Sequence, residues 1–363
     1  MGPSLQEIAD KLDVSTTLVS RVLNNKQNVR VASETRARIL KAAEELNYRP
    51  SASARALATG RTMQIAVLTS EASRMRDGNN YADLRGLVDI ASAMDYRVLL
   101  LPLRDGDEGA RQLENLIRDR ICDGMCLFAD KLSEGQLQVL KRHPLPFVVV
   151  GDEPVATSGQ DLNSAVRVDF DNYRLTFDAV AWLKAQGHTS IGYARAAGEA
   201  NQPHCQALRA GYERGLVECG AGEPIYAMVP RSDDDIRDFA ARRECTALIV
   251  RDFYNALAWS RTLLQSGWRL PEDITILAIL KSTDVVSLFM GGWNEVLACQ
   301  PHDSRHGALI AGQVLVDWIA GNYPDKRTFF VPPSQPGWCK DVYHDIEKKN
   351  RALFAKLSNG VSP

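Results

Sequence analysis

From residue 63 onward, short uninterrupted apolar runs alternate with segments whose apolar residues recur at helical spacing. The apolar runs are residues 65–68, 98–101, 124–128 and 147–150. The helical segments between them are residues 82–94, 109–118 and 135–142. Strands that are apolar on both faces and separated by helices form parallel sheets covered on both sides. This part of the chain therefore predicts a doubly wound α/β subdomain.

The same alternation occurs a second time further along the chain. We expect strands at residues 190–193, 247–250 and 274–279, and helices at residues 173–186, 206–219 and 255–266. The predicted core thus consists of two doubly wound parallel-sheet subdomains. Small ligands bind beyond the carboxyl ends of such strands, and two facing subdomains form a cleft that can close by hinge motion.

The first 48 residues have a different pattern, that of three short helices. Ser4 and Glu7 have the spacing of a capping box, which predicts that a helix begins at Leu5. Ser15 is placed to cap a second helix, and Ser33 to cap a third over residues 34–46. The apolar residues expected to form one small shared core are Leu5, Ile8, Ala9, Leu12, Val19, Val22, Leu23, Ile39, Ala43 and Leu46.

The second of these helices would present small polar side chains and one arginine to solvent. The outward residues are Ser15, Thr16, Thr17, Ser20, Arg21 and Asn24. Threonine can contact base edges or a thymine methyl, arginine a guanine or a phosphate, and serine or asparagine a phosphate. Two short helices joined by a tight turn, with such a surface, are typical of a helix-turn-helix that binds DNA.

Residues 49–62 are predicted to form a short alanine-rich helix that is not stable by itself. Pro50 suits the first turn of a helix, and Leu57 is its sizeable apolar side chain. Leu57 is either a core residue or a wedge between base pairs in a minor groove, where Ala54 would let a second helix approach closely. The sequence leaves both interpretations open.

Charge is distributed unevenly along the chain. Residues 1–62 contain 10 Lys and Arg against 6 Asp and Glu, a net charge of +4, whereas the whole chain carries −2. A basic end on an acidic body favours binding of a polyanion at that end, although an ordinary solvated surface can have the same imbalance.

The sequence lacks the patterns of export, metal binding and catalysis. Its seven cysteines have no metal-ligand spacing, which indicates buried thiols in a reducing compartment. Neither a leader pattern nor an apolar run long enough to span a membrane occurs, so we expect a cytoplasmic protein. The motifs G-x-S-x-G and H-E-x-x-H and a phosphate-binding loop are missing. We therefore expect no catalytic residues, no metal and no cofactor.

Three strings in the first sixty residues carry a specific resemblance: VSTTLVSRVLNN, ETRARILKAAEELNYRP and SASARALATG. They resemble the headpiece and hinge of the lactose-repressor (LacI/GalR) family of bacterial transcription regulators. Later strings, among them FVVVGD, VRVDFDN and SGWRLPEDITILAI, are similar to the effector domain of that family in the same order. The resemblance implies an all-α helix-turn-helix headpiece followed by an α/β core like that of periplasmic binding proteins.

By this resemblance the chain has a headpiece (1–48), a hinge helix or linker (49–62), a two-lobed core (63–338) and a tail (339–363). Lobe 1 is expected at residues 63–163 and 298–330, and lobe 2 at residues 164–297 and 331–338. The chain would cross between the lobes near Asn163, Ala298 and Phe330. The implied function is that of a homodimeric repressor, which binds a double-stranded DNA operator with an affinity modulated by a small effector.

The strand ends that would line the cleft carry the candidate effector-binding residues. They are Ser70, Asp130, Asp152, Arg195, Arg251, Phe253, Lys281 and Gln300, with His204 near the start of a predicted helix. Sugar-responsive family members carry an arginine where this chain has Leu208, and an acidic residue where it has Lys281. Since lysine and arginine donate but do not accept hydrogen bonds, Arg195, Arg251 and Lys281 favour a carboxylate or phosphate on the effector.

Three other interpretations of the core remain open. The cations can be solvated at the rim and paired with Asp252 or Glu199. The cleft can also have lost ligand binding, which would make the regulator independent of an effector. An enzyme on a periplasmic-binding-protein-like fold is the third alternative, and turnover without specific operator binding would identify it.

The tail has a four-three-four apolar spacing. Its core positions are Cys339, Tyr343, Ile346, Asn350, Leu353 and Leu357. Asparagine at such a position can fix the register of a coiled coil, so the tail could join dimers into a tetramer. The segment is short for an independent coiled coil and fits equally well a helix docked on its own domain or a frayed end.

Overall fold

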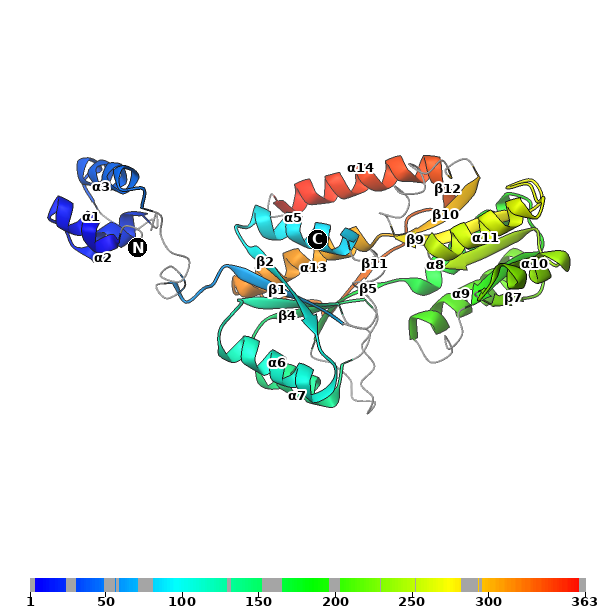
Figure 1. Cartoon of the computed structure of the whole chain (residues 1–363), viewed down its shortest axis with the longest axis horizontal. Coiled ribbons are helices and arrows are strands. Elements are labelled where there is room, and N and C mark those ends of the chain that lie inside the picture. Colours follow the sequence, from blue (N-terminus) through cyan, green and yellow to red (C-terminus); the bar gives the residue numbers. More distant parts are fainter. Residues whose placement is uncertain are drawn as a thin grey trace. The chain divides into compact units, whose positions relative to one another are not determined.

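A computed structural model describes residues 4–23, 31–48, 56, 59–70, 81–128, 132–151, 165–195, 203–228, 230–251, 253–281, 293 and 296–358. The chain divides into two compact units, each described here by itself. The first comprises residues 1–63 with residues 120–122, and the second comprises residues 64–119 and 123–363. The colours of Figure 1 follow the chain from the blue amino-terminal helices to the red carboxy-terminal helix.

The first unit contains three helices, α1 (Leu5–Leu12), α2 (Thr16–Leu23) and α3 (Ser33–Glu45). The predicted capping box is confirmed, because Ser4 Oγ accepts from the Glu7 amide while the Glu7 carboxylate accepts from the Ser4 amide. The predicted cap of the third helix is wrong by one residue. Ser33 is already helical, and the N-cap is Ala32, which makes no side-chain hydrogen bond.

The three helices pack around one small core. Ile8, Val19 and Ile39 are each 0 % exposed, and the other predicted core residues are buried or half-buried around them. At the surface, Lys11 Nζ lies 2.6 Å from Glu45 Oε2 and so links α1 to α3. The hydrogen bond from Lys11 lowers the pKa of Glu45. The predicted helical headpiece is therefore present as a unit with its own core.

Lobe 1 is built on a parallel six-stranded sheet with the order β11-β5-β4-β3-β1-β2. Its strands are β1 (Gln64–Ser70), β2 (Arg97–Leu103), β3 (Gly124–Phe128), β4 (Phe147–Val150), β5 (Val166–Phe170) and β11 (Thr328–Val331). Its helices are α5 (Tyr81–Ala93), α6 (Gly106–Arg118), α7 (Glu134–Arg142) and α13 (Ser304–Ile319). The central strands β3 and β4 are buried at every position, as their uninterrupted apolar sequences predict.

Lobe 2 has a second six-stranded sheet with the order β12-β10-β9-β8-β6-β7. Its strands are β6 (Ile191–Arg195), β7 (Ile225–Met228), β8 (Ala247–Arg251), β9 (Thr275–Lys281), β10 (Leu297–His302) and β12 (Gly337–Trp338). Only the short β12 is antiparallel to its described neighbour. Its helices are α8 (Asn172–Ala185), α9 (Pro203–Cys219), α10 (Asp233–Ala241) and α11 (Phe253–Gln265). The predicted pair of doubly wound subdomains is confirmed.

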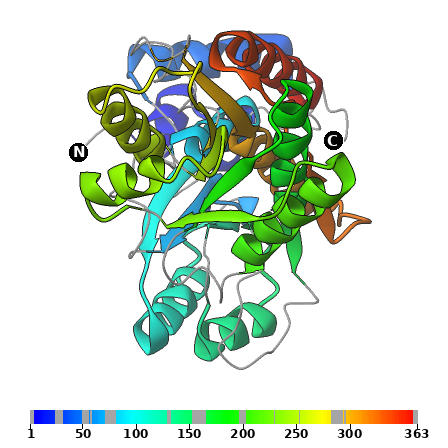
Figure 2. The same cartoon turned by 90° about the vertical axis from the view of Figure 1, so that its right-hand side faces the viewer.

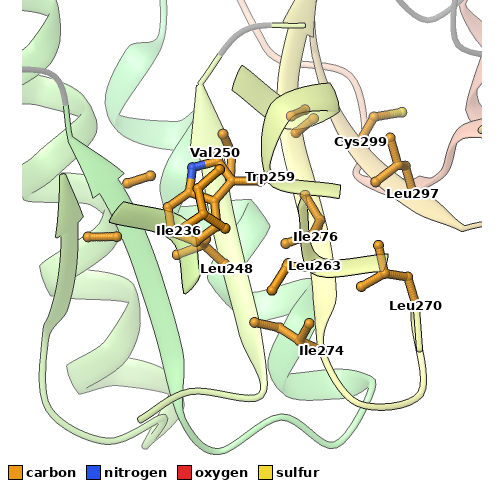
Figure 3. Packing of buried hydrophobic residues seen from close by; sticks show 14 of the residues in the cluster. Ile236, Leu248, Val250, Trp259, Leu263, Leu270, Ile274, Ile276, Leu297 and Cys299 are labelled. Atoms are coloured by element: carbon orange, nitrogen blue, oxygen red, sulfur yellow. The ribbon is translucent and has the colours of Figure 1, made fainter. Parts of the chain in front are cut away.

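Side chains alternate along β8, which explains why helices cover both faces of this sheet. Leu248 and Val250 pack in one cluster with Trp259 of α11, whereas Ala247 and Ile249 pack with α8 and α9 on the other face. In Figure 2 the green helices α8 and α9 and the yellow-green helices α10 and α11 lie on opposite sides of the strands. Figure 3 shows the cluster around Trp259 from close by.

The first crossing between the lobes comes later than predicted. β5 pairs with β4 and β11 of lobe 1, so the chain leaves that lobe after Phe170 rather than near Asn163. Asp171 then caps α8, because its carboxylate accepts from the Arg174 amide at 2.9 Å. The string VRVDFDN therefore contains β5, which is the last strand of lobe 1 before the first crossing. It also contains Asp171, which caps α8, the first helix of lobe 2.

The second crossing is also later than predicted, and the third lies close to its predicted place. β10 pairs with β9 in lobe 2, so the chain returns to lobe 1 after His302 rather than near Ala298. The third crossing lies between β11 and β12, just after Phe330. No strand was predicted at β5, β10, β11 or β12, so the predicted places of the crossings depended on the family resemblance alone.

The tail forms α14 (Cys339–Ser358) and lies against the core of its own chain. Cys339 and Val342 belong to the lobe 2 cluster, and Leu353 and Phe354 pack near the other end of the helix. These contacts agree with the docked-helix interpretation. Oligomerisation through the tail stays a prediction.

Cysteine burial agrees with the expectation of buried thiols. Six of the seven cysteines are buried, and all seven are free. Burial raises the pKa of Cys245 to about 11 and that of Cys126 further. Within the described ranges, no three His, Cys, Asp or Glu side chains gather as metal ligands. In the same part of the chain no helix is both long enough and apolar enough to cross a membrane.

Candidate DNA-binding helix and effector-binding strand ends

The start of α2 is fixed by Ser15, as the sequence predicts. The Leu18 amide donates to Ser15 Oγ at 3.2 Å, and the Val19 amide donates to the Ser15 carbonyl oxygen at 3.1 Å. Because these contacts satisfy amides that lack partners within the helix, α2 begins at Thr16 with a defined orientation.

The two sides of α2 differ in exposure. Val19 and Val22 face the core and are 0 % and 2 % exposed. Thr17 and Arg21 are exposed and Ser20 is half-buried; their i, i+3 and i+4 spacing places them on one side of the helix. Ser15 is exposed and Thr16 is half-buried at the start of the helix. The described candidate DNA-binding residues thus form one continuous solvent-facing surface.

Three candidate DNA-binding residues, Asn24, Ala54 and Leu57, lie outside the described residues. Ala56 is described and is helical, and its carbonyl oxygen accepts from the Gly60 amide at 2.8 Å. Gly60 has φ +71°, a conformation that ends helices because glycine adopts it without steric cost.

Four strands of lobe 2 bring their carboxyl ends to the same edge of the sheet. Ala194 of β6 pairs with Val250 of β8, Arg251 with Ile279 of β9, and Ile279 with Gln300 of β10. The register therefore places Arg195, Arg251 and Gln300 at one level, and Lys281 two residues further along β9. This edge is where ligands bind in doubly wound sheets.

Arg251 contacts the first turn of α9. Its Nη1 lies 2.9 Å from Cys205 Sγ and its Nη2 lies 3.3 Å from His204 Nε2. A guanidinium has only donors, so Nε2 accepts in this arrangement and the imidazole is neutral. The imidazole thus holds the guanidinium in place without cancelling its charge.

Arg195 is held in a different way. Its guanidinium lies over the Tyr226 ring at 4.5 Å from the centroid, and Arg209 lies over the same ring at 5.6 Å. The Tyr226 hydroxyl donates to Glu213, and that hydrogen bond is the main cause of the lowered pKa of Glu213. Arg195 is therefore part of a cation–π cluster at the β7 edge, so its strand-end position alone does not make it an effector ligand.

Gln300 is fully buried at the same edge. Its Nε2 donates to the Ser334 carbonyl oxygen at 2.7 Å, which ties β10 to the third crossing. Its Oε1 has no hydrogen-bond partner among the described residues. A buried acceptor without a partner is costly, so this atom suits a donor from a bound molecule.

The remaining candidates are less fully described. Asp130 and Asp152 lie outside the described residues. Ser70, Phe253 and Lys281 are the terminal residues of β1, α11 and β9, but their side chains are not described. Leu208 is 2 % exposed, whereas Arg209 faces away and pairs with Glu213 at 2.7 Å. Arg209, the next residue along the helix, therefore does not take the place of the family arginine.

The structure also adds residues to which the sequence analysis gave no role. The rings of Phe170 and His302 pack with their centroids 4.0 Å apart and their planes tilted by 40°, at the first and second crossings. Next to them burial raises the pKa of Asp169, which accepts from the Phe170 amide at 2.7 Å. Cys205 is likewise new as a partner of Arg251. Sequence gives no signal for the Arg251–Cys205 and Phe170–His302 contacts, since the two members of each are 46 and 132 residues apart.

Residues 4–51 match the family described as "Bacterial regulatory proteins, lacI family". Catabolite control protein A of Priestia megaterium is 31 % identical over 221 residues, which are 61 % of this chain and 63 % of that protein. The transcriptional repressor PurR of Aliivibrio fischeri is 28 % identical over 346 residues, which are 91 % of this chain and 96 % of PurR. These relatives are transcription regulators, in agreement with the expectation that the chain is not an enzyme.

Solved structures have the same fold. A crystal structure of the lac repressor dimer bound to operator and the anti-inducer ONPF has a TM-score of 0.71 and 20 % sequence identity. The match covers 92 % of this chain and 97 % of that chain. At this identity the likeness concerns the fold: an amino-terminal helical headpiece and a core of two parallel-dominated sheets.

Proposed function

Because residues 4–51 match the lacI family of bacterial regulatory proteins, we propose that the chain is a repressor of that family, which binds a specific operator and responds to a small molecule at its strand ends. The observation that carries the DNA-binding half is the exposed surface of α2. Thr17, Ser20 and Arg21 lie on one side of a helix whose start is capped and whose other side is anchored in a core. Such a helix is suited to the major groove.

One headpiece of this size reads only a half-site, so we propose that two chains bind a near-palindromic operator. Relatives of this fold include a lac repressor dimer on its operator. In the proposal, Leu57 of two paired hinge helices enters the central minor groove and bends the DNA, with Ala54 at their close approach.

Replacing Arg21 by alanine is expected to lower specific operator affinity by about 1–3 kcal/mol, because one base or phosphate contact is lost. An operator selected from random duplexes supplies the probe, and fluorescence anisotropy gives the affinity. Arg38→Ala is the matched control, since it removes the same charge from an exposed position on α3. Equal losses of specific affinity in the two variants would show that Arg21 acts only through net charge.

For the effector we propose an anion, such as a sugar acid, a sugar phosphate or an organic acid. The support is the guanidinium of Arg251, held at the strand ends by Cys205 and His204, and Lys281 at the end of the adjacent strand. Gln300 Oε1 would accept a hydroxyl of the same molecule. Effector binding would change operator affinity by the difference in its affinity for two lobe arrangements, about 1–3 kcal/mol.

Replacing Arg251 by glutamine is expected to weaken binding of an anionic effector by about 1.5–3 kcal/mol, the worth of a hydrogen bond to a charged group. Calorimetry with sugar acids, sugar phosphates and neutral sugars is the measurement. Arg261→Gln is the control, because Arg261 is an exposed arginine of α11 paired with Asp233. Tight binding of an uncharged hexose would contradict the anionic proposal, and no binding at all would favour an effector-independent regulator.

A further inference from the structure

The two ends of α14 lie in different lobes. Cys339 and Val342, at its start, are 0 % and 6 % exposed within the cluster that includes Leu297 and Cys299 of lobe 2. Near its other end Leu353 and Phe354 pack on Ile90 of α5 and Leu309 of α13 in lobe 1. The red helix can be followed in Figure 1 from β12 to α5.

The middle of α14 also lies beside lobe 1. Burial lowers the pKa of His306 on α13, Asp303 raises it, and the charge of Lys349 on α14 lowers it again. Lys349 is therefore close to the first turn of α13, which immediately follows the second crossing. From Val342 to Leu353 the helix rises about 16 Å, at about 1.5 Å per residue.

A helix anchored at both ends restricts hinge motion. The three crossings let the lobes rotate by changes in a few backbone torsions, but an α-helix does not stretch. Rotation of one lobe against the other must therefore displace one end of α14. The lobe 1 end is the weaker anchor, because Leu353 and Phe354 are only half-buried whereas Cys339 is fully buried beside the β10–β12 pair.

We propose that α14 is a strap that holds the two lobes in the arrangement of this structure. Release of Leu353 and Phe354 from α5 and α13 accompanies the lobe rotation through which an effector acts on operator binding. The contact adds a fixed free energy in favour of the lobe arrangement of this structure. An effector that favours the other arrangement must offset this free energy by its difference in affinity for the two arrangements. The regulatory part of the proposal, the effect on operator binding, rests on the proposed function. The mechanical part, the restraint of lobe rotation by α14, does not.

The double substitution Leu353→Ala with Phe354→Ala tests the mechanical part in the full chain. Alanine keeps the helix favourable while removing the contact. The readout is hydrogen exchange at the Asp171 amide, which donates to the Val331 carbonyl oxygen at 3.3 Å and so joins the first and third crossings. We expect this exchange to become at least about tenfold faster, as local opening at the crossings grows more frequent. The control is Lys348→Ala with Lys356→Ala, two exposed positions of α14, and should leave the rate unchanged.

Two results would overturn the strap. An unchanged exchange rate at Asp171 would show that the contact does not restrain the crossings. Equal acceleration at Asp171 and at central core amides such as Val67 and Leu248 would show that Leu353 and Phe354 only stabilise the fold as a whole. Amides in the first half of α14 report whether the helix itself persists in the variant.

Operator binding tests the regulatory part, with a duplex selected from random DNA by the wild-type chain. We expect the strap variant to bind it with an affinity changed by at least about fivefold without effector, a factor typical of coupling between sites. Unchanged affinity with accelerated exchange at Asp171 would overturn the regulatory part. If the wild-type chain selects no duplex, the proposed function fails, and the exchange result still decides the strap.

Discussion

Replacement of Ile39 by alanine is expected to abolish specific operator binding while the core keeps its thermal stability. Ile39 is 0 % exposed and lies in the single cluster that holds α1, α2 and α3 together. Truncating a buried isoleucine to alanine lowers the free energy of unfolding by about 2–5 kcal/mol. A unit of this size has little stability to lose, so the loss should unfold the headpiece and with it the DNA-binding surface of α2.

Leu40→Ala is the matched control for this experiment. Leu40 follows Ile39 on the same helix but is 49 % exposed, so its truncation should leave both stability and operator affinity near wild type. Operator affinity by fluorescence anisotropy and thermal unfolding by circular dichroism give the two readouts. If Ile39→Ala binds the operator as tightly as Leu40→Ala, either the core assignment or the role of the headpiece is wrong.

Local signals explain why the headpiece could be predicted closely from the sequence. The Ser4–Glu7 box and the Ser15 cap act on amides three residues away, so the sequence contains both partners of each contact. Ser33 shows the limit of this reasoning. A serine before a helical segment can be its cap or its first residue, and here Ala32 occupies the cap position.

The parallel sheets could be predicted because central strands are apolar on both faces. β7 and α10 were not predicted, since the four residues of β7 include only one buried position and α10 begins with three aspartates. The crossings were placed early because no strand was predicted at β5 or β10, and the pairing of β5 with β4 and of β10 with β9 keeps each strand in the lobe that precedes the crossing.

The candidate effector residues also have one property that could be predicted from the sequence and one that could not. Strand-end positions predicted which backbone atoms would meet at one edge, and the register agrees with this for Arg195, Arg251 and Gln300. The directions of the side chains depend on neighbours from other elements. Tyr226 engages Arg195, whereas the start of α9 holds Arg251. Periodicity of the tail likewise identified an apolar stripe but not the surface that covers it.

Replacement of Leu263 by alanine is expected to lower the free energy of unfolding of the second unit by about 2–5 kcal/mol. Leu263 is 1 % exposed and packs with Trp259, Leu248 and Ile276 in the cluster between α11 and the sheet of lobe 2. α11 follows β8 almost directly, so the packing that Leu263 contributes also fixes the strand end that carries Arg251. Effector affinity should therefore fall together with stability.

The adjacent residue provides a chemically identical control. Leu264→Ala removes the same atoms at a position that is 42 % exposed, so it should change the free energy of unfolding by no more than about 0.5 kcal/mol. Urea denaturation of both variants gives the comparison, because a shift of midpoint at constant slope reports stability alone. Equal losses in the two variants would mean that the outer face of α11 is also buried, which sedimentation would test as an interface between chains.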